Sequence, residues 1–171
     1  VSATTIPTAL SVTASPNPPI AKQSATFTAT ATPAANHHIV SYQFIWGDGD
    51  SNTTSSPVIQ HAYSQSGPYM ITLTVRDDLG QSSTGNTVVT VSSGLTAAFT
   101  TNKSGTTVTF DASTSSSQVA STITDYAWDF DSDGSYDANG SSPIASKDYG
   151  ANGTYRATLR ITDSRGVTAT L

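Results

Sequence analysis

The chain has 171 residues, no cysteine and a net charge of −5, and its twelve acidic residues are all aspartate. Without glutamate no complete EF-hand can form, because its twelfth ligand is a bidentate Glu, and without cysteine neither disulfides nor Cys-ligated zinc is available. The seven scattered basic residues give no positive patch for nucleic acid, and no apolar run is long enough to span a membrane.

Val, Thr, Ile and Tyr alternate with polar residues along most of the chain. These residue types favour strands, and a period of two is typical of a sheet with one buried face. We therefore expect an all-β protein with almost no helix. In the first half, strands are expected at about residues 9–14, 24–32, 39–46, 57–61, 69–76 and 86–91, with a short one near 51–55.

The second half repeats the first at a period of about 86 residues. Residues 61–80 line up with 147–166, and 42–49 line up with 126–134 with one extra residue in the second copy. A unit of this length is typical of one β-sandwich domain. The repeat predicts two tandem β-sandwiches, at 1–92 with an extra N-terminal segment at 1–7 and at 93–171, joined at Ser92-Ser93-Gly94.

A repeated aromatic strand supplies the expected core of each domain. Successive side chains of a strand point to opposite faces, so Tyr42, Phe44 and Trp46 share one face. We expect this face to point inward, where the rings serve as packing residues rather than as a ligand platform. The counterparts in the second copy are Tyr126, Trp128 and Phe130.

The order of motifs in each copy resembles the polycystic kidney disease (PKD) domain. In the first copy the series is Trp46-Gly-Asp48-Gly49, His61-Ala-Tyr63, Gly67-Pro-Tyr69, Leu73-Thr-Val75 and then Asp77 before Gly80. The second copy repeats it as Trp128-Asp-Phe130-Asp-Ser-Asp133-Gly134, Asp148-Tyr149, Gly153-Thr-Tyr155 and Asp163. The resemblance implies immunoglobulin-like sandwiches of the kind found in extracellular repeat arrays, surface-layer and adhesion proteins, and as accessory modules of secreted proteases and chitinases.

A dense group of aspartates in the second copy is a candidate calcium site. Carboxylates at alternate positions, followed by a glycine that permits a sharp turn, can fold their oxygens around one hard cation. The expected ligands are Asp129, Asp131, Asp133, Asp137 and the backbone carbonyl of Ser135, with Asp163 and Asp111 as possible completing ligands. The alternative is a hairpin turn whose carboxylates cap backbone amides and face water.

The first copy lacks most of these aspartates. Asp48 matches Asp133, but Ile45 stands in place of Asp129 and nothing matches Asp131. We therefore expect calcium, if bound, in the second domain only.

No catalytic residues are assigned, and we expect a protein that is not an enzyme. All three histidines lie in the first copy, and the sequence has no Gly-x-Ser-x-Gly nucleophile motif. His37-His38 is expected to be a solvated loop pair, because no third metal ligand is evident. Four sequons for N-glycosylation occur, at Asn52, Asn102, Asn139 and Asn152.

The second copy lacks most of its last expected strand, and the first copy is preceded by an extra segment. Leu171 is level with Gly85, so most of the counterpart of the strand at 86–91 is missing from the second copy. A sandwich without an edge strand exposes unpaired backbone and invites another strand. Two interpretations stay open: either the chain was cut from a longer array, or the alternating segment at 1–6 of one chain completes the second domain of the next by strand addition, which would build a filament.

The sequence favours a non-catalytic spacer, adhesion or assembly module of an extracellular, cell-surface or filament protein. Its expected partners are neighbouring domains of the same or an identical chain. The alternative is an accessory module of a secreted hydrolase that binds polysaccharide or fibrous protein.

Overall fold

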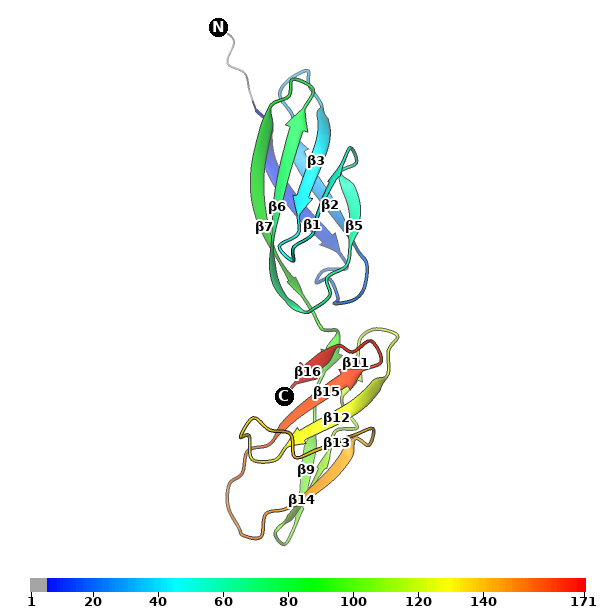
Figure 1. Ribbon diagram of the computed structural model, residues 1–171, viewed down its shortest axis with the longest axis vertical. Helices are drawn as coiled ribbons and strands as arrows, with labels where there is room; N and C mark the ends of the chain where they lie inside the picture. The colour runs from blue at the N-terminus through cyan, green and yellow to red at the C-terminus, as the bar shows by residue number, and fades with distance from the viewer. Residues whose placement is uncertain (1–5) are drawn as a thin grey trace. The chain divides into compact units, whose positions relative to one another are not determined.

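A computed structural model describes residues 6–171, and it confirms an all-β protein with no helix among them (Figure 1). No helix of this described part could therefore cross a membrane. The chain divides into two compact units, residues 1–92 and 93–171.

The first unit is a sandwich of two antiparallel sheets, with strand orders β1-β2-β5 and β4-β3-β6-β7. The observed strands agree with the expected ones to within a few residues, except that the last begins earlier. They are β1 (Thr8–Ser15), β2 (Ala25–Thr32), β3 (Ile39–Ile45), β4 (Ser51–Thr54), β5 (Val58–His61), β6 (Gly67–Asp77) and β7 (Ser82–Val91).

Alternation of apolar and polar residues places one face of each sheet in the core of this sandwich. Phe27 of β2 and Phe44 of β3 are fully buried, and the Trp46 ring lies between them at centroid distances of 4.9 and 5.0 Å. Tyr42, expected on the same inward face, is only half-buried. The aromatic strand thus forms the centre of the core, as the period-two pattern predicts.

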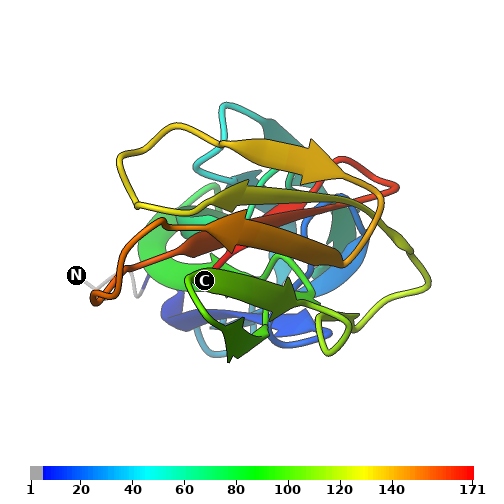
Figure 2. The same ribbon diagram turned by 90° about the horizontal axis from the view of Figure 1, so that it is seen from below.

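The second unit is also built of antiparallel strands, which form three sheets (Figure 2). Its sheets have the orders β14-β10-β9, β11-β8 and β13-β12-β15-β16. The strands are β8 (Leu95–Thr96), β9 (Thr100–Ser104), β10 (Thr107–Asp111), β11 (Ser116–Ser117), β12 (Ile123–Asp129), β13 (Ala138–Gly140), β14 (Ile144–Asp148), β15 (Thr158–Asp163) and β16 (Thr168–Thr170).

The last hairpin of the second unit is much shorter than its counterpart in the first. β6 has eleven residues, of which residues 67–76 pair with β7, whereas β15 has six and β16 has three. The expected extra segment at 1–7 has only Ile6 and Pro7 among the described residues, and neither belongs to a strand.

Candidate metal sites

The acidic loop of the second domain connects β12 to β13. One carboxylate oxygen from each of Asp129, Asp131 and Asp137 lies within 4.8 Å of the others. Asp129, the last residue of β12, is almost completely buried, whereas the other two are exposed. The fold therefore brings together three of the aspartates that the sequence assigns to a cation.

Backbone amides of the same loop already bond to these carboxylates. Gly134 donates its N–H to Oδ2 of Asp129 at 3.0 Å, and Asp133 donates to Oδ1 at 3.3 Å. Phe130 donates its N–H to Oδ2 of Asp137 at 2.8 Å. Burial raises the pKa of Asp129, but the amide hydrogen bonds outweigh that effect and hold the pKa below its ordinary value. These are the contacts of the amide-capping turn, the alternative interpretation of this loop.

A lysine supplies positive charge next to the loop. Lys147 of β14 lies 4.0 Å from Oδ1 of Asp137, and its ammonium is 5.6 Å from the centroid of the Phe130 ring. A cation near the face of an aromatic ring is attracted to its negative quadrupole, so the ring helps to place the charge. The repulsion between the aspartates is thus partly offset by the protein itself.

Two of the expected ligands lie elsewhere. Asp163 pairs with Ile123 at the far end of β12 from Asp129, six residues away, or about 20 Å along a strand at ~3.3 Å per residue. Asp111 ends β10 opposite Ile144 and accepts the N–H of Ser113 at 2.9 Å. Neither reaches the loop, because each lies at the opposite end of its strand pair.

The remaining expected ligands are Asp133 and Ser135, which bond to one another. Ser135 donates its backbone N–H to Oδ1 of Asp133 at 2.7 Å. Asp133 does not belong to the group of three carboxylates whose oxygens lie within 4.8 Å.

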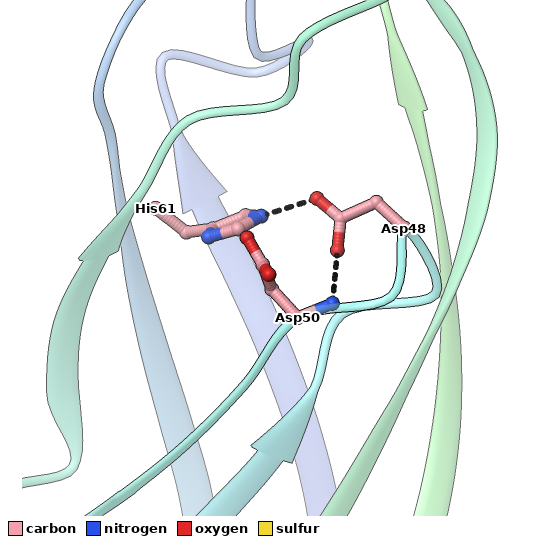
Figure 3. A group of neighbouring side chains, drawn as sticks. All are labelled: Asp48, Asp50 and His61. Carbon is pink, nitrogen blue, oxygen red and sulfur yellow. Dashed lines mark hydrogen bonds and ion pairs between the residues drawn. The ribbon is translucent and has the colours of Figure 1, made fainter.

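The first domain has a comparable group of possible metal ligands, Asp48, Asp50 and His61 (Figure 3). Comparing the two copies in the sequence did not predict this group. Nε2 of His61 lies 2.7 Å from Oδ2 of Asp48, and the N–H of Asp50 donates to Oδ1 of Asp48 at 3.1 Å. The His61 ring also stacks on Trp46, with 4.4 Å between centroids and an interplanar angle of 1°. Each domain therefore contains a candidate group, which corrects the expectation of a group in the second domain alone.

Within this group, Asp48 has a pKa that departs from its ordinary value. Burial raises the pKa of Asp48, but the hydrogen bonds from His61 and from the Asp50 amide outweigh it, and the pKa lies below its ordinary value. A signal for the site was present in the repeat, because His61 occupies the position of Lys147. In both domains the side chain at this position carries a nitrogen that lies close to a carboxylate and next to an aromatic ring. The nitrogen belongs to an imidazole in the first domain and to an ammonium group in the second.

In each domain, a tyrosine two residues after His61 or Lys147 contacts the end of the aromatic strand. Tyr63 donates its hydroxyl to the backbone carbonyl of Trp46 at 3.1 Å, and Tyr149 donates to that of Phe130 at 2.8 Å. Burial raises the pKa of both tyrosines further above neutral, and each protonated hydroxyl donates at neutral pH. The tyrosine repeated in the two domains thus fixes the end of the aromatic strand in each.

The other polar candidates lie on the surface. His37 and His38 both contact the carboxylate of Asp78, at 3.0 and 3.3 Å.

Oδ1 of Asn52 accepts the Trp46 indole N–H at 2.7 Å, so this sequon residue has a structural role in β4. Oδ1 of Asn152 accepts a hydrogen bond from Lys103 at 2.8 Å. The other two sequon residues, Asn102 in β9 and Asn139 in β13, are exposed.

Comparison with known proteins identifies the repeated unit. The family model described as PKD domain matches residues 7–91 and again residues 96–170. A solved structure of carbohydrate-binding modules from the β-sandwich superfamily has a TM-score of 0.51 at 20% identity. It covers 92% of this chain and 55% of that one, and it shows a shared fold.

Two bacterial proteins share short stretches of similar sequence with the chain. Collagenase ColQ1 of Bacillus cereus is 45% identical over 56 residues, which are 33% of this chain and 6% of the collagenase. Collagenase ColA of Bacillus cereus is 37% identical over 65 residues, which are 38% of this chain and 7% of that protein. The matched stretch is therefore a small part of each collagenase.

Proposed function

The chain belongs to the PKD domain family, and we propose that it serves as an accessory module of an extracellular hydrolase, where it contacts a fibrous protein or polysaccharide substrate. PKD domains are non-catalytic modules, and both matched segments are PKD domains. The observation that carries the proposal is the similarity to the two collagenases. Collagen lies outside bacterial cells, so an extracellular location is part of the same proposal.

Co-sedimentation with insoluble polymers tests this function. The chain is mixed with fibrillar collagen, cellulose or chitin, and the fraction in the pellet is measured against serum albumin as a non-binding control. We expect saturable enrichment in the collagen pellet, with loss of enrichment after the chain is thermally unfolded. Partition equal to that of albumin on all three polymers would contradict substrate contact.

A second candidate function, a spacer between other modules, is favoured by the placement of the aromatic rings. Among the described aromatic residues only Tyr136 and Tyr155 are more than a third exposed, at 38% and 45%. The Tyr136 ring is covered by the Arg160 guanidinium at 4.1 Å, and the Tyr155 ring stacks on Tyr149 at 3.9 Å. Residues 6–171 therefore present no row of uncovered aromatic rings to which a sugar chain could bind. Failure to bind any of the three polymers would support the spacer function.

Calcium binding by the loop at 129–137 stays a prediction. It is supported by the three convergent carboxylates, and their amide hydrogen bonds leave further oxygen lone pairs for a cation. A bound ion would link β12 to β13 and so stabilise the second domain.

A further inference from the structure

A histidine pair and an aspartate from a different loop meet at one end of the first domain. His37 and His38 lie between β2 and β3, and Asp78 lies in the turn between β6 and β7. Nδ1 of His37 is 3.0 Å from Oδ1 of Asp78, and Nδ1 of His38 is 3.3 Å from Oδ2. No third metal ligand is evident near the two histidines in the sequence, and the fold brings one from 40 residues away.

Backbone hydrogen bonds fix the two loops to each other at this point. The Asp78 amide donates to the carbonyl of His38 at 3.1 Å, one residue beyond the last pair of β3 with β6. The His38 amide donates in turn to Oδ1 of Asp78 at 3.5 Å. The imidazoles and the carboxylate are therefore held by backbone that continues a sheet, and the separation of the two loops is set by strand pairing.

The spacing of the ligand atoms suits a small divalent ion. Imidazole nitrogen and carboxylate oxygen bind Zn²⁺ at about 2.0–2.2 Å, so two such ligands at neighbouring positions around the ion lie about 2.8–3.6 Å apart. Both distances between Nδ1 and the Asp78 carboxylate fall in this range. The two imidazoles approach different oxygens of this carboxylate. The group closes on one ion when the His38 side chain, which is 74% exposed, turns toward His37.

A buried carboxylate oxygen without a partner lies on the same side of this turn. Asp77 is 1% exposed, and its Oδ2 accepts no hydrogen bond. In the second domain the counterpart of this oxygen, Oδ2 of Asp163, accepts the hydroxyl of Ser121. Strand pairing is the same in both domains, with residue 39 opposite 77 and residue 123 opposite 163, so His37 stands in the place of Ser121. By this equivalence, Oδ2 of Asp77 is directed toward His37.

Negative charge at this end of the domain is not offset by lysine or arginine. In the part of the chain that the structure describes, neither of the adjacent carboxylates, Asp77 and Asp78, forms an ion pair with either residue type. The cation of the same turn, Arg76, donates its Nε to the carbonyl of Gly80 at 3.1 Å instead. Two neighbouring carboxylates repel each other, so a bound cation would be favoured here.

We propose that His37, His38 and Asp78 bind one divalent transition-metal ion such as Zn²⁺, with the carboxylate of Asp77 adding negative charge behind it. Two imidazoles and one carboxylate suit such an ion, whereas Ca²⁺ and Mg²⁺ take oxygen ligands. Three protein ligands leave one position of a tetrahedral ion for water. The ion would join the β2–β3 loop to the β6–β7 turn, and this role does not depend on contact with a polymer.

Imidazole nitrogen signals of the whole chain test the proposal. The chain has three histidines, so long-range ¹H–¹⁵N spectra recorded during a titration with zinc chloride can follow every imidazole. We expect the Nδ1 signals of His37 and His38 to shift together and to saturate. A shift confined to His61, which would place the ion beside Asp48, or the absence of a saturable shift at the histidine pair, would overturn the proposal.

Two variants with the same change of charge form a matched pair. Asp78→Asn alters the carboxylate that both imidazoles contact, so the dissociation constant for zinc, read from the His37 signal, should rise at least tenfold. Asp148→Asn, at an exposed position of the second domain, should change it less than twofold. His38→Gln removes a ligand from an exposed position and should also weaken binding at least tenfold. If the Asp78 and Asp148 variants bound zinc equally well, the ion would be only weakly associated with the surface and the three-ligand site would be refuted.

Discussion

Replacing Arg165 with leucine should destabilise the second domain by about 3 kcal/mol. Asp163 is completely buried, and its Oδ2 lies 2.7 Å from Nη2 and 2.8 Å from Nε of Arg165. The other bond to this oxygen is the hydroxyl of Ser121, at 2.9 Å. Removal of the guanidinium would leave a buried carboxylate oxygen with a single neutral donor.

The size of the effect follows from burial. Loss of one partner from a fully buried ion pair costs about 3–5 kcal/mol, and a hydrogen bond to a charged group contributes about 1.5–3 kcal/mol. Arg165 is 17% exposed, so water can replace part of the lost interaction, and the lower part of this range applies. For a domain of this size 3 kcal/mol corresponds to a decrease in Tm of about 12–24 °C.

Tryptophan fluorescence can report on the unfolding of each domain separately. The chain has two tryptophans, Trp46 in the first domain and Trp128 in the second. A Trp46→Phe background therefore leaves Trp128 as the fluorescent reporter of the second domain during urea or thermal unfolding. The exposed Arg156, replaced by leucine, is the control with the same change of charge and should change stability by less than about 0.5 kcal/mol. If the Arg165 and Arg156 variants unfolded within about 1 kcal/mol of one another, the argument from the buried pair would be refuted.

Three further predictions use the same measurements. Leu79→Arg should stabilise the first domain by about 1 kcal/mol, because Oδ2 of Asp77 is buried without a hydrogen-bond partner and Leu79 stands where the second domain has Arg165. The reporter is Trp46 in a Trp128→Phe background, and an unchanged unfolding midpoint would contradict this. Burial raises the pKa of Asp163, but a backbone amide and the Arg165 guanidinium outweigh it and hold the pKa below its ordinary value. Stability from this group should be fully present above about pH 4 and lost as the pH falls through the lowered folded-state pKa, so the urea midpoint of the second domain should decrease between pH 5 and pH 2, and a constant midpoint would argue against the linkage. Millimolar calcium should raise the Tm of the second domain and not that of its Asp137→Asn variant. An equal shift in the second domain of the variant would show that the ion acts elsewhere.

Most of the fold could be predicted from local patterns in the sequence. The strand expected at 69–76 is β6, Gly67–Asp77, and the inward positions of Phe44 and Trp46 follow from alternation. The immunoglobulin-like sandwich and the PKD family were likewise indicated by motifs repeated at one period, and the family match at 7–91 and 96–170 confirms the family. Strand identity is a local property, because it depends on the alternation of neighbouring side chains.

The candidate metal groups were predicted only in part. Asp129, Asp131 and Asp137 are close in the sequence, and a loop so short keeps them close in space. Asp163 was expected to join them, but the register of β12 with β15 places it at the other end of the strand pair. His61 was missed for the converse reason, since β5 brings it to Asp48 from the opposite sheet.

The sequence by itself determined the all-β class, the two repeats and the residues of each core, because these depend on periodicity and on turn residues that act over a few positions. The tertiary structure alone decided which charges meet. It paired Asp163 with Arg165 and Ser121, and it placed His61 between Trp46 and Asp48. These contacts depend on sheet register and on the packing of two layers, and neither is encoded in the spacing of residues along one strand.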